Sequence, residues 1–267
     1  IPFGIAQIGK AFRNEIIARN FIFRTREFEQ MEMQYFVKPG TDDQIMNEWK
    51  EKRFQFYLEK LSVDEKKLRF KEHGKNELAH YAKEAWDIEY EFPFGWSEIE
   101  GVHNRTDFDL SRHEEFSGKN LSYFDQPNNE RFLPYIIETS AGLNRMLLTV
   151  LADAYWEDEE NNRVVMRLHP RLAPIKAVVC PLLKKDGLPE KAREIMDLLK
   201  PHFKTIYDQQ GSIGKRYYRQ DEAGTPFGIT VDHQSTEDNT VTLRHRDSQK
   251  QDRVAIDELI NTINKSI

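Results

Sequence analysis

Cysteine is almost absent from this chain of 267 residues: Cys180 is the only one. An internal disulfide and a thiolate-rich zinc site are therefore both excluded, and we expect no zinc. Cys180 lies in the apolar run 177–183, which favours a buried, inert thiol over a nucleophile. The lack of disulfides is typical of a reducing compartment, so the sequence predicts a cytoplasmic protein.

The chain also lacks an apolar run of membrane-spanning length, a visible signal peptide and an initiator methionine. Since it opens on Ile1-Pro2, inside what reads as a strand or turn, we expect a fragment of a longer protein. With 39% hydrophobic and 31% charged residues, its length suits two soluble domains. The net charge of −6 argues weakly against duplex nucleic acid as a partner, but local basic runs leave phosphate contacts open.

Charged side chains alternate with apolar ones in the segment 12–36, FRNEIIARNFIFRTREFEQMEMQYF. Arg13 and Glu15 stand two residues apart, and Arg24, Arg26, Phe28, Glu32 and Phe36 follow at even spacing. In a strand, even spacing places side chains on one face, while Met31, Met33, Tyr35 and Val37 take the other. The pattern predicts an antiparallel pair of strands with an apolar back and a charged front.

A charged strand face is usually solvated, but Phe28 stands among the charges of this one. An aromatic ring suits stacking, arginine suits phosphate and glutamate suits an amine. The front of the hairpin therefore indicates a planar, anionic ligand.

Helices are predicted at 44–61 and 76–86 from their apolar spacing, and short strands at 88–92 and 96–101 around the turn Pro93-Phe94-Gly95. Glu98 and Glu100 would share one face of the second strand, where two carboxylates suit hydrated Mg²⁺. A buried strand at 135–139, a small-residue turn at 140–142 and a helix then follow. Arg145 lies in the first turn or so of that helix, beside Glu138 and Ser140 of the strand.

The polar segment 156–163 reads as a linker, so we predict domains at 1–163 and 164–267. The second half alternates strands and helices: strand 177–183, helix 189–203, strand 205–207, helix 212–222, strands 227–231 and 240–246, and a helix from Arg253. Such alternation predicts a mixed sheet covered by helices. The segment 211–214 lacks the spacing and the ending of a P-loop, so it predicts no second nucleotide site.

These motifs, in this order, resemble the class II aminoacyl-tRNA synthetases, and the wording FRNEI followed by RTREFEQMEMQYF resembles the glycyl-tRNA synthetases most. The segments GWSEIEG and PYIIETSAGLNRMLL are similar to the family's metal-proximal segment and motif 3, although Asn144 replaces the usual glycine before Arg145. The words GSIGKRYYRQDEAGTPFGITVD and EDNTVTLRHRD resemble the anticodon-binding domain of the glycyl, threonyl, histidyl and prolyl enzymes. The implied fold is an α+β catalytic domain with an antiparallel sheet, followed by an α/β anticodon-binding domain with a mixed sheet.

The resemblance implies activation of glycine by ATP with Mg²⁺ and transfer of the glycyl group to the 3′ end of tRNA(Gly). Arg13 would grip the glycine carboxylate and the α-phosphate, and Glu15 would accept from the adenine amino group or orient Arg13. Arg24 would hold the terminal phosphates. Phe28 would stack on adenine with Arg145 on its other side, and Glu98 would take part in Mg²⁺ binding. The implied glycine-binding residues are Arg13, Glu32, Glu138 and Ser140.

In the second domain, Arg216, Tyr217, Arg219 and Phe227 supply charge and aromatic faces suited to unstacked anticodon bases. The family's motif 1 and its R-P-E-T-A-Q segment are absent from the chain, and the class implies a homodimer in the full-length protein. Two alternatives stay open: another class II synthetase with the same anticodon domain, and a non-catalytic, nucleic-acid-binding relative. Retention of Arg13, Arg24 and Arg145 argues against the second.

Overall fold

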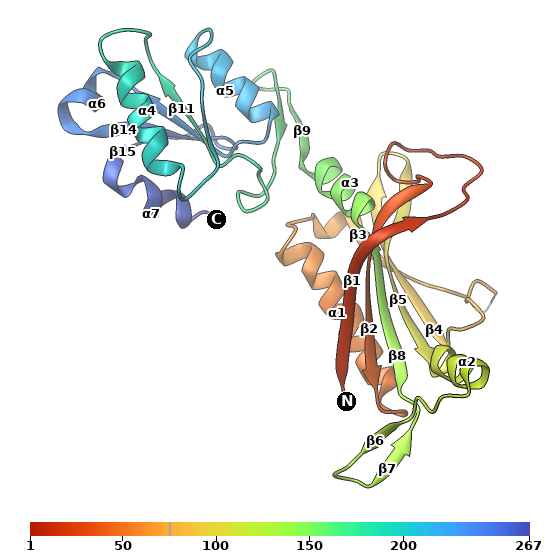
Figure 1. The fold of residues 1–267 in the computed structure, drawn as a ribbon. Helices are drawn as coiled ribbons and strands as arrows, with labels where there is room; N and C mark the ends of the chain where they lie inside the picture. The colour runs from red at the N-terminus through yellow and green to blue at the C-terminus, as the bar shows by residue number, and fades with distance from the viewer. Residues whose placement is uncertain (75) are drawn as a thin grey trace. The chain divides into compact units, whose positions relative to one another are not determined.

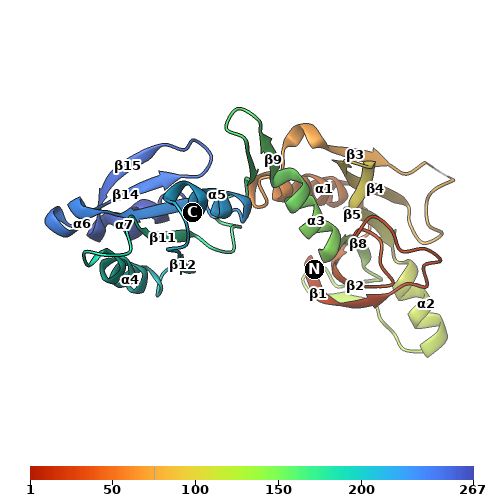
Figure 2. The same cartoon turned by 90° about the horizontal axis from the view of Figure 1, so that it is seen from above.

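The computed structural model describes residues 1–74 and 76–267, which fold into two compact units, Ile1–Val150 and Leu151–Ile267. Figures 1 and 2 show that each unit is built around its own sheet. None of the helices in the described ranges is long and apolar enough to cross a membrane.

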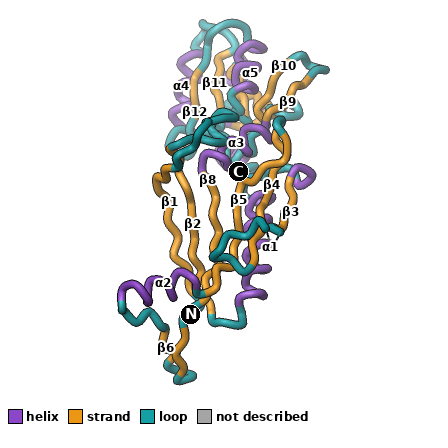
Figure 3. Tube along the Cα trace, turned by 90° about the vertical axis from the view of Figure 1, so that its right-hand side faces the viewer, coloured by secondary structure: helices purple, strands orange, loops and turns teal. Residues whose placement is uncertain are grey.

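The first unit is a six-stranded sheet in the order β1-β2-β8-β5-β4-β3, and every neighbouring pair is antiparallel (Figure 3). The long central strands allow one face to carry a row of side chains from several strands. The elements are β1 (Phe3–Phe12), β2 (Glu27–Val37), α1 (Asp42–Glu59), a 3₁₀ turn (Glu65–Lys67), β3 (Leu68–Glu72), β4 (Glu84–Phe92), β5 (Gly95–Thr106), α2 (Phe108–Ser117), β6 (Tyr123–Asp125), β7 (Glu130–Phe132), β8 (Tyr135–Gly142) and α3 (Leu143–Ala154).

Helix α1 covers the apolar face of this sheet. Val37, Met46, Val102 and Ile137 form a buried cluster there, and Trp49 packs against it. The odd residues of β2 thus face α1, as the alternation predicts, and the even residues face away. The fold class predicted for this half is confirmed.

Two local predictions for the part of the first unit that precedes β4 are wrong. The segment 76–86 is not a helix: it forms turns and then enters β4 at Glu84. Lys83 binds Asp42 and Asp43 at the start of α1, with Nζ–O distances of 2.9 and 2.5 Å, so tertiary ion pairs hold this segment in an extended form. Arg24 also lies outside β2, in a loop that runs from Arg13 to Arg26 between the two strands.

The second unit carries a five-stranded mixed sheet in the order β12-β11-β13-β14-β15, with parallel pairs at β12-β11-β13 and antiparallel pairs after them. The predicted mixed sheet is confirmed, whereas β15 and α6 were missed. The helix predicted from Arg253 is wrong at its start, because Arg253 lies in a strand and the last helix begins at Leu259. Its elements are β9 (Tyr155–Asp158), β10 (Arg163–Met166), β11 (Ala177–Pro181), α4 (Leu188–Leu199), β12 (Thr205–Tyr207), α5 (Ile213–Glu222), β13 (Phe227–Val231), α6 (His233–Asp238), β14 (Thr240–His245), β15 (Gln251–Ala255), a 3₁₀ turn (Ile256–Glu258) and α7 (Leu259–Asn264).

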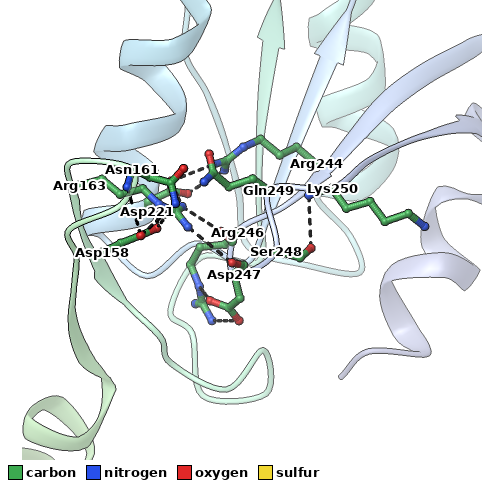
Figure 4. Close-up of polar contacts among 10 residues, drawn as sticks. All are labelled: Asp158, Asn161, Arg163, Asp221, Arg244, Arg246, Asp247, Ser248, Gln249 and Lys250. Atoms are coloured by element: carbon green, nitrogen blue, oxygen red, sulfur yellow. Dashed lines mark hydrogen bonds and ion pairs between the residues drawn. The ribbon is translucent and has the colours of Figure 1, made fainter.

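The segment 156–163, predicted as a linker from its polar composition, lies within a hairpin, β9-β10. Buried ion pairs explain the difference. Arg163 of β10 bonds Asp158 at 2.7 Å and Asp221 of α5 at 2.6 Å, and Arg244 of β14 binds Asp221 with both terminal nitrogens (Figure 4). These charged residues join the hairpin to the body of the second unit.

Gly228 in β13 is a point of close packing against α5. A methyl group there would lie 2.6 Å from Cε1 and 2.9 Å from Cδ1 of Tyr217, whose hydroxyl is bonded to Thr230. Because that bond holds the ring in place, we expect Gly228→Ala to destabilise the second unit by about 1–3 kcal/mol, measured by chemical denaturation.

Gly214 in α5 is the matched control, because a methyl group at this position would have no atom within 4 Å. Gly214→Ala should be neutral or slightly stabilising, as alanine is the better helix former. Equal effects of the two changes would contradict the packing explanation.

Candidate functional site

A cavity of about 680 Å³ opens on the face of the first sheet that α1 does not cover. Its floor is formed by even residues of β2 and by side chains of β8 and β5, and its walls by the loop after β1 and by α2 and α3. All of the predicted first-domain site residues line it, namely Arg13, Glu15, Arg24, Phe28, Glu32, Glu98, Glu138, Ser140 and Arg145. They come from segments up to 132 positions apart (145 minus 13), which antiparallel pairing of β2, β8 and β5 brings together.

One end of the cavity is cationic and aromatic. The Arg13 guanidinium carbon lies 5.3 Å from the centroid of the Phe28 ring. Arg24 extends a terminal nitrogen to within 3.8 Å of a Glu15 carboxylate oxygen. This grouping of two arginines and an aromatic ring suits a ligand that combines a flat ring with phosphates.

Arg145 enters the same end from the first turn of α3. Its Nη1 donates to the backbone carbonyl of Glu98 at 2.9 Å and lies 3.3 Å from the Glu98 carboxylate. The strand β8 runs directly into α3, with no separate turn at 140–142. Asn144, where the sequence departs from the family pattern, accepts a hydrogen bond from the backbone of Glu29 and so ties α3 to β2.

Glu98 and Glu100 do not share a strand face, so the predicted pair of metal-binding carboxylates is wrong. The pairing of β4 with β5 shifts register at Ile88/Glu89, which makes Ile99 an extra residue in β5. Glu98 faces the cavity, whereas Glu100 is 1% exposed and bonds Arg53 of α1 at 2.5 Å. Among the described residues no group of three or more acidic, histidine or cysteine side chains has the geometry of a metal site.

The middle of the cavity is lined by polar side chains. Gln30 donates to the Ser140 hydroxyl at 2.7 Å, and that hydroxyl lies 3.4 Å from a Glu32 oxygen. Glu32 keeps an exposed carboxylate at this point. The arrangement provides a charged acceptor and a hydroxyl side by side for a small cationic group.

The far end of the cavity is organised around Glu138, which is 6% exposed. Gln34 donates to its Oε2 at 2.8 Å, His103 Nδ1 lies 3.2 Å from Oε1, and Arg105 Nη1 reaches both oxygens at 3.3 and 3.1 Å. Burial alone would raise the pKa of Glu138, but the bonds from His103 and Gln34 and the charge of Arg105 lower it. The carboxylate is therefore ionised and fixed.

Sequence reasoning missed Gln30, Gln34 and His103 as residues of the cavity, and it assigned no role to Arg105, which matches a family segment. For the two glutamines the signal was present, since they continue the even spacing of Phe28 and Glu32 in β2. For His103 and Arg105 it was hidden, because the extra residue at Ile99 breaks the alternation of β5.

The four residues predicted to contact anticodon bases do not share an exposed face. Arg216, Tyr217 and Phe227 are 3%, 8% and 3% exposed. Arg216 is used inside the second unit, where it donates to the carbonyls of Pro181 and Gly211. Direct base contacts by these three side chains do not fit the structure. Arg219 is accessible, since its side chain is 46% exposed, although it also pairs with Asp208 at 2.5 Å.

Comparison with known proteins gives two family matches. Residues 1–154 match the model described as tRNA synthetase class II core domain (G, H, P, S and T), and residues 176–266 match the model described as anticodon binding domain.

Similar curated proteins include three glycine–tRNA ligases. Those of Treponema denticola and Borrelia hermsii are 62% and 54% identical over the whole chain, and that of Chlorobaculum tepidum is 55% identical over 95% of it. The chain spans 61% of the length of the first two relatives and 54% of the third.

Proposed function

The chain belongs to the class II tRNA synthetase core family (G, H, P, S and T), and we propose that its protein activates glycine with ATP and transfers the glycyl group to tRNA. The observation that carries this proposal is the cavity of the first unit, in which Arg13, Phe28 and Arg145 stand at one end and Glu32 and Glu138 further along. One end suits a nucleotide and the other an ammonium group.

Arg13 is the proposed catalytic side chain. In this proposal it binds the glycine carboxylate and the α-phosphate, aligns an in-line attack and neutralises charge that develops in the transition state. Phe28 and Arg145 hold the two faces of the adenine ring. Glu15 orients the ring or Arg13, and Arg24 holds the terminal phosphates.

The fit of Mg²⁺ is judged from its usual coordination in ATP sites. Magnesium with ATP commonly keeps several waters and uses one or two protein carboxylates beside the phosphates, so the single carboxylate of Glu98 is sufficient. Bound there, Mg²⁺ would neutralise phosphate charge. Without ligand, Glu98 is held near this place by Arg145.

Glycine offers an ammonium and a carboxylate but no side chain, so its recognition depends on those two groups and on walls that exclude larger residues. In the proposal, Glu32, Glu138 and Ser140 receive the ammonium while Arg13 receives the carboxylate. The anticodon-binding match in the second unit supports tRNA(Gly) as the partner, with Arg219 as a proposed contact. The proposal also includes a homodimer of the full-length protein, because resemblance to the class II synthetases implies one.

We expect Glu32→Gln and Ser140→Ala to raise the KM for glycine roughly tenfold while changing the KM for ATP much less, since the first removes the negative charge and the second removes the hydroxyl acceptor proposed to receive the ammonium group. Glycine-dependent ATP–pyrophosphate exchange measures both constants. Glu48→Gln, at an exposed position of α1 paired with Lys52, is the matched control. A parallel rise in both KM values would count against a role in glycine selection.

The experiment that tests the function is ATP–pyrophosphate exchange on the full natural protein with a panel of amino acids. Exchange that depends on glycine supports the proposal. Exchange that depends on another amino acid would identify a different class II synthetase, and no exchange with any of them would identify a non-catalytic relative. Arg13, Arg24 and Arg145 all line the cavity, which argues against a non-catalytic relative, and the carboxylates of Glu32 and Glu138 in the same cavity argue against a synthetase for an amino acid with a larger side chain.

A further inference from the structure

At the end of the cavity proposed to receive the ammonium group, two further charged side chains, Arg105 and Asp109, lie next to Glu138. Arg105 of β5 donates through Nη1 to both oxygens of Glu138 and through Nε and Nη2 to Asp109 of α2, at 2.7 and 2.9 Å. Its guanidinium carbon also lies 3.9 Å from the centre of the Tyr81 ring. Each nitrogen of the Arg105 guanidinium thus bonds a carboxylate within the protein.

Arg105 has little freedom to act on a ligand by itself. Its side chain is 16% exposed, and the two bonds to Asp109 fix the plane of the guanidinium. Asp109 belongs to the first turn of α2, so the geometry of Arg105 is set by a helix. Through Nη1, that fixed plane acts together with Gln34 and His103 to set where the Glu138 carboxylate lies.

A buried carboxylate without such partners would behave differently. Burial favours the neutral acid, which offers an ammonium group a weaker acceptor than the ionised form does. A carboxylate free to rotate would also have to be ordered when its ligand binds, at a cost in affinity. The surroundings of Glu138 remove both costs before glycine arrives.

We propose that Arg105, anchored by Asp109, is a positioning residue that holds the Glu138 carboxylate in the orientation that receives the ammonium group of the amino acid. This inference rests on the proposed function and deepens it. In this proposal Arg105, although it lines the cavity, acts on the substrate through Glu138. The nucleotide end, formed by Arg13, Phe28 and Arg145, is built from other residues, so the two ends are separable by experiment.

The test is the pair of variants Arg105→Gln and Arg105→Lys, measured by ATP–pyrophosphate exchange on the full natural protein. Arg105→Gln should raise the KM for glycine roughly 10- to 100-fold and leave the KM for ATP within about twofold. Arg105→Lys keeps the charge but loses the fork, so an intermediate rise is expected. Arg105→Lys also keeps a positive charge beside Glu138 and Asp109, so it provides a second test if Arg105→Gln folds poorly.

A double-variant cycle tests the anchor. Asp109→Asn should also raise the KM for glycine. Combining it with Arg105→Gln should raise that KM little further, because both changes disrupt the same Asp109–Arg105–Glu138 chain of contacts. Arg112→Gln is the matched control: it is an exposed arginine of the same helix, paired with Glu115, and should leave both constants unchanged.

An unchanged KM for glycine in Arg105→Gln, or equal rises for glycine and ATP, would overturn the inference and leave the proposed function standing. Additive effects of Arg105→Gln and Asp109→Asn would overturn the role of the anchor. If the wild-type protein shows no exchange with glycine, the proposed function fails, and the inference fails with it.

Discussion

Replacement of Arg13 by alanine is expected to lower glycine-dependent ATP–pyrophosphate exchange by about 10²- to 10³-fold or more. This is the usual effect of removing a preorganised hydrogen-bond donor that stabilises the charge of a transition state. The stability of the protein should change little. Within the described residues, the Arg13 guanidinium contacts the Phe28 ring and forms no ion pair. The loss of exchange would thus report chemistry, and unfolding curves measured alongside it would verify this.

Arg131→Ala is the control for that experiment. Arg131 lies in β7, where it contacts the Phe124 ring at 4.8 Å, and it does not line the cavity. Its replacement removes the same charge from the first unit without touching the site, so exchange should stay near normal. Near-normal exchange in Arg13→Ala would reject the catalytic assignment.

The second large effect is expected at Asp221, the centre of the charged network in the second unit (Figure 4). Asp221 is 1% exposed and accepts from Arg163 and twice from Arg244, whose side chains are 2% and 4% exposed. Asp221→Asn keeps the shape but leaves two buried guanidinium groups with one fewer counter-charge. We expect a loss of about 3–5 kcal/mol in the free energy of unfolding, measured by denaturant titration of the second unit's transition.

Asp252→Asn provides the comparison, because Asp252 is 39% exposed and pairs with the exposed Lys250. That surface pair should contribute about 0–1 kcal/mol. If Asp221→Asn were as mild as Asp252→Asn, the network would not be what holds the β9-β10 hairpin to the second unit.

The face of β2 could be predicted from the sequence because a half-buried strand alternates strictly. Phe28, Glu32 and Phe36 share the cavity face, and Tyr35 and Val37 face α1. Glu100 could not be placed, since one extra residue in β5 reverses the face of every side chain after it. Nothing in the local sequence marks Ile99 as that residue.

Long-range pairing explains the other differences. The apolar spacing at 76–86 is compatible with a helix, but Lys83 is bound by Asp42 and Asp43, about 40 positions earlier. In the same way, the basic and aromatic pattern of α5 does not distinguish a surface from an interior. Arg216 can be buried because its guanidinium donates to the backbone carbonyls of Pro181 and Gly211, which the local sequence does not reveal.

The central claim is that the cavity of the first unit holds the activated amino acid, and its most direct test is a structure of the full natural protein with a stable glycyl-adenylate analogue. We predict the adenine ring against Phe28 and the ammonium group within hydrogen-bond distance of Glu32 or Glu138. An analogue bound outside this cavity, or bound with its ammonium group away from both carboxylates, would contradict the claim.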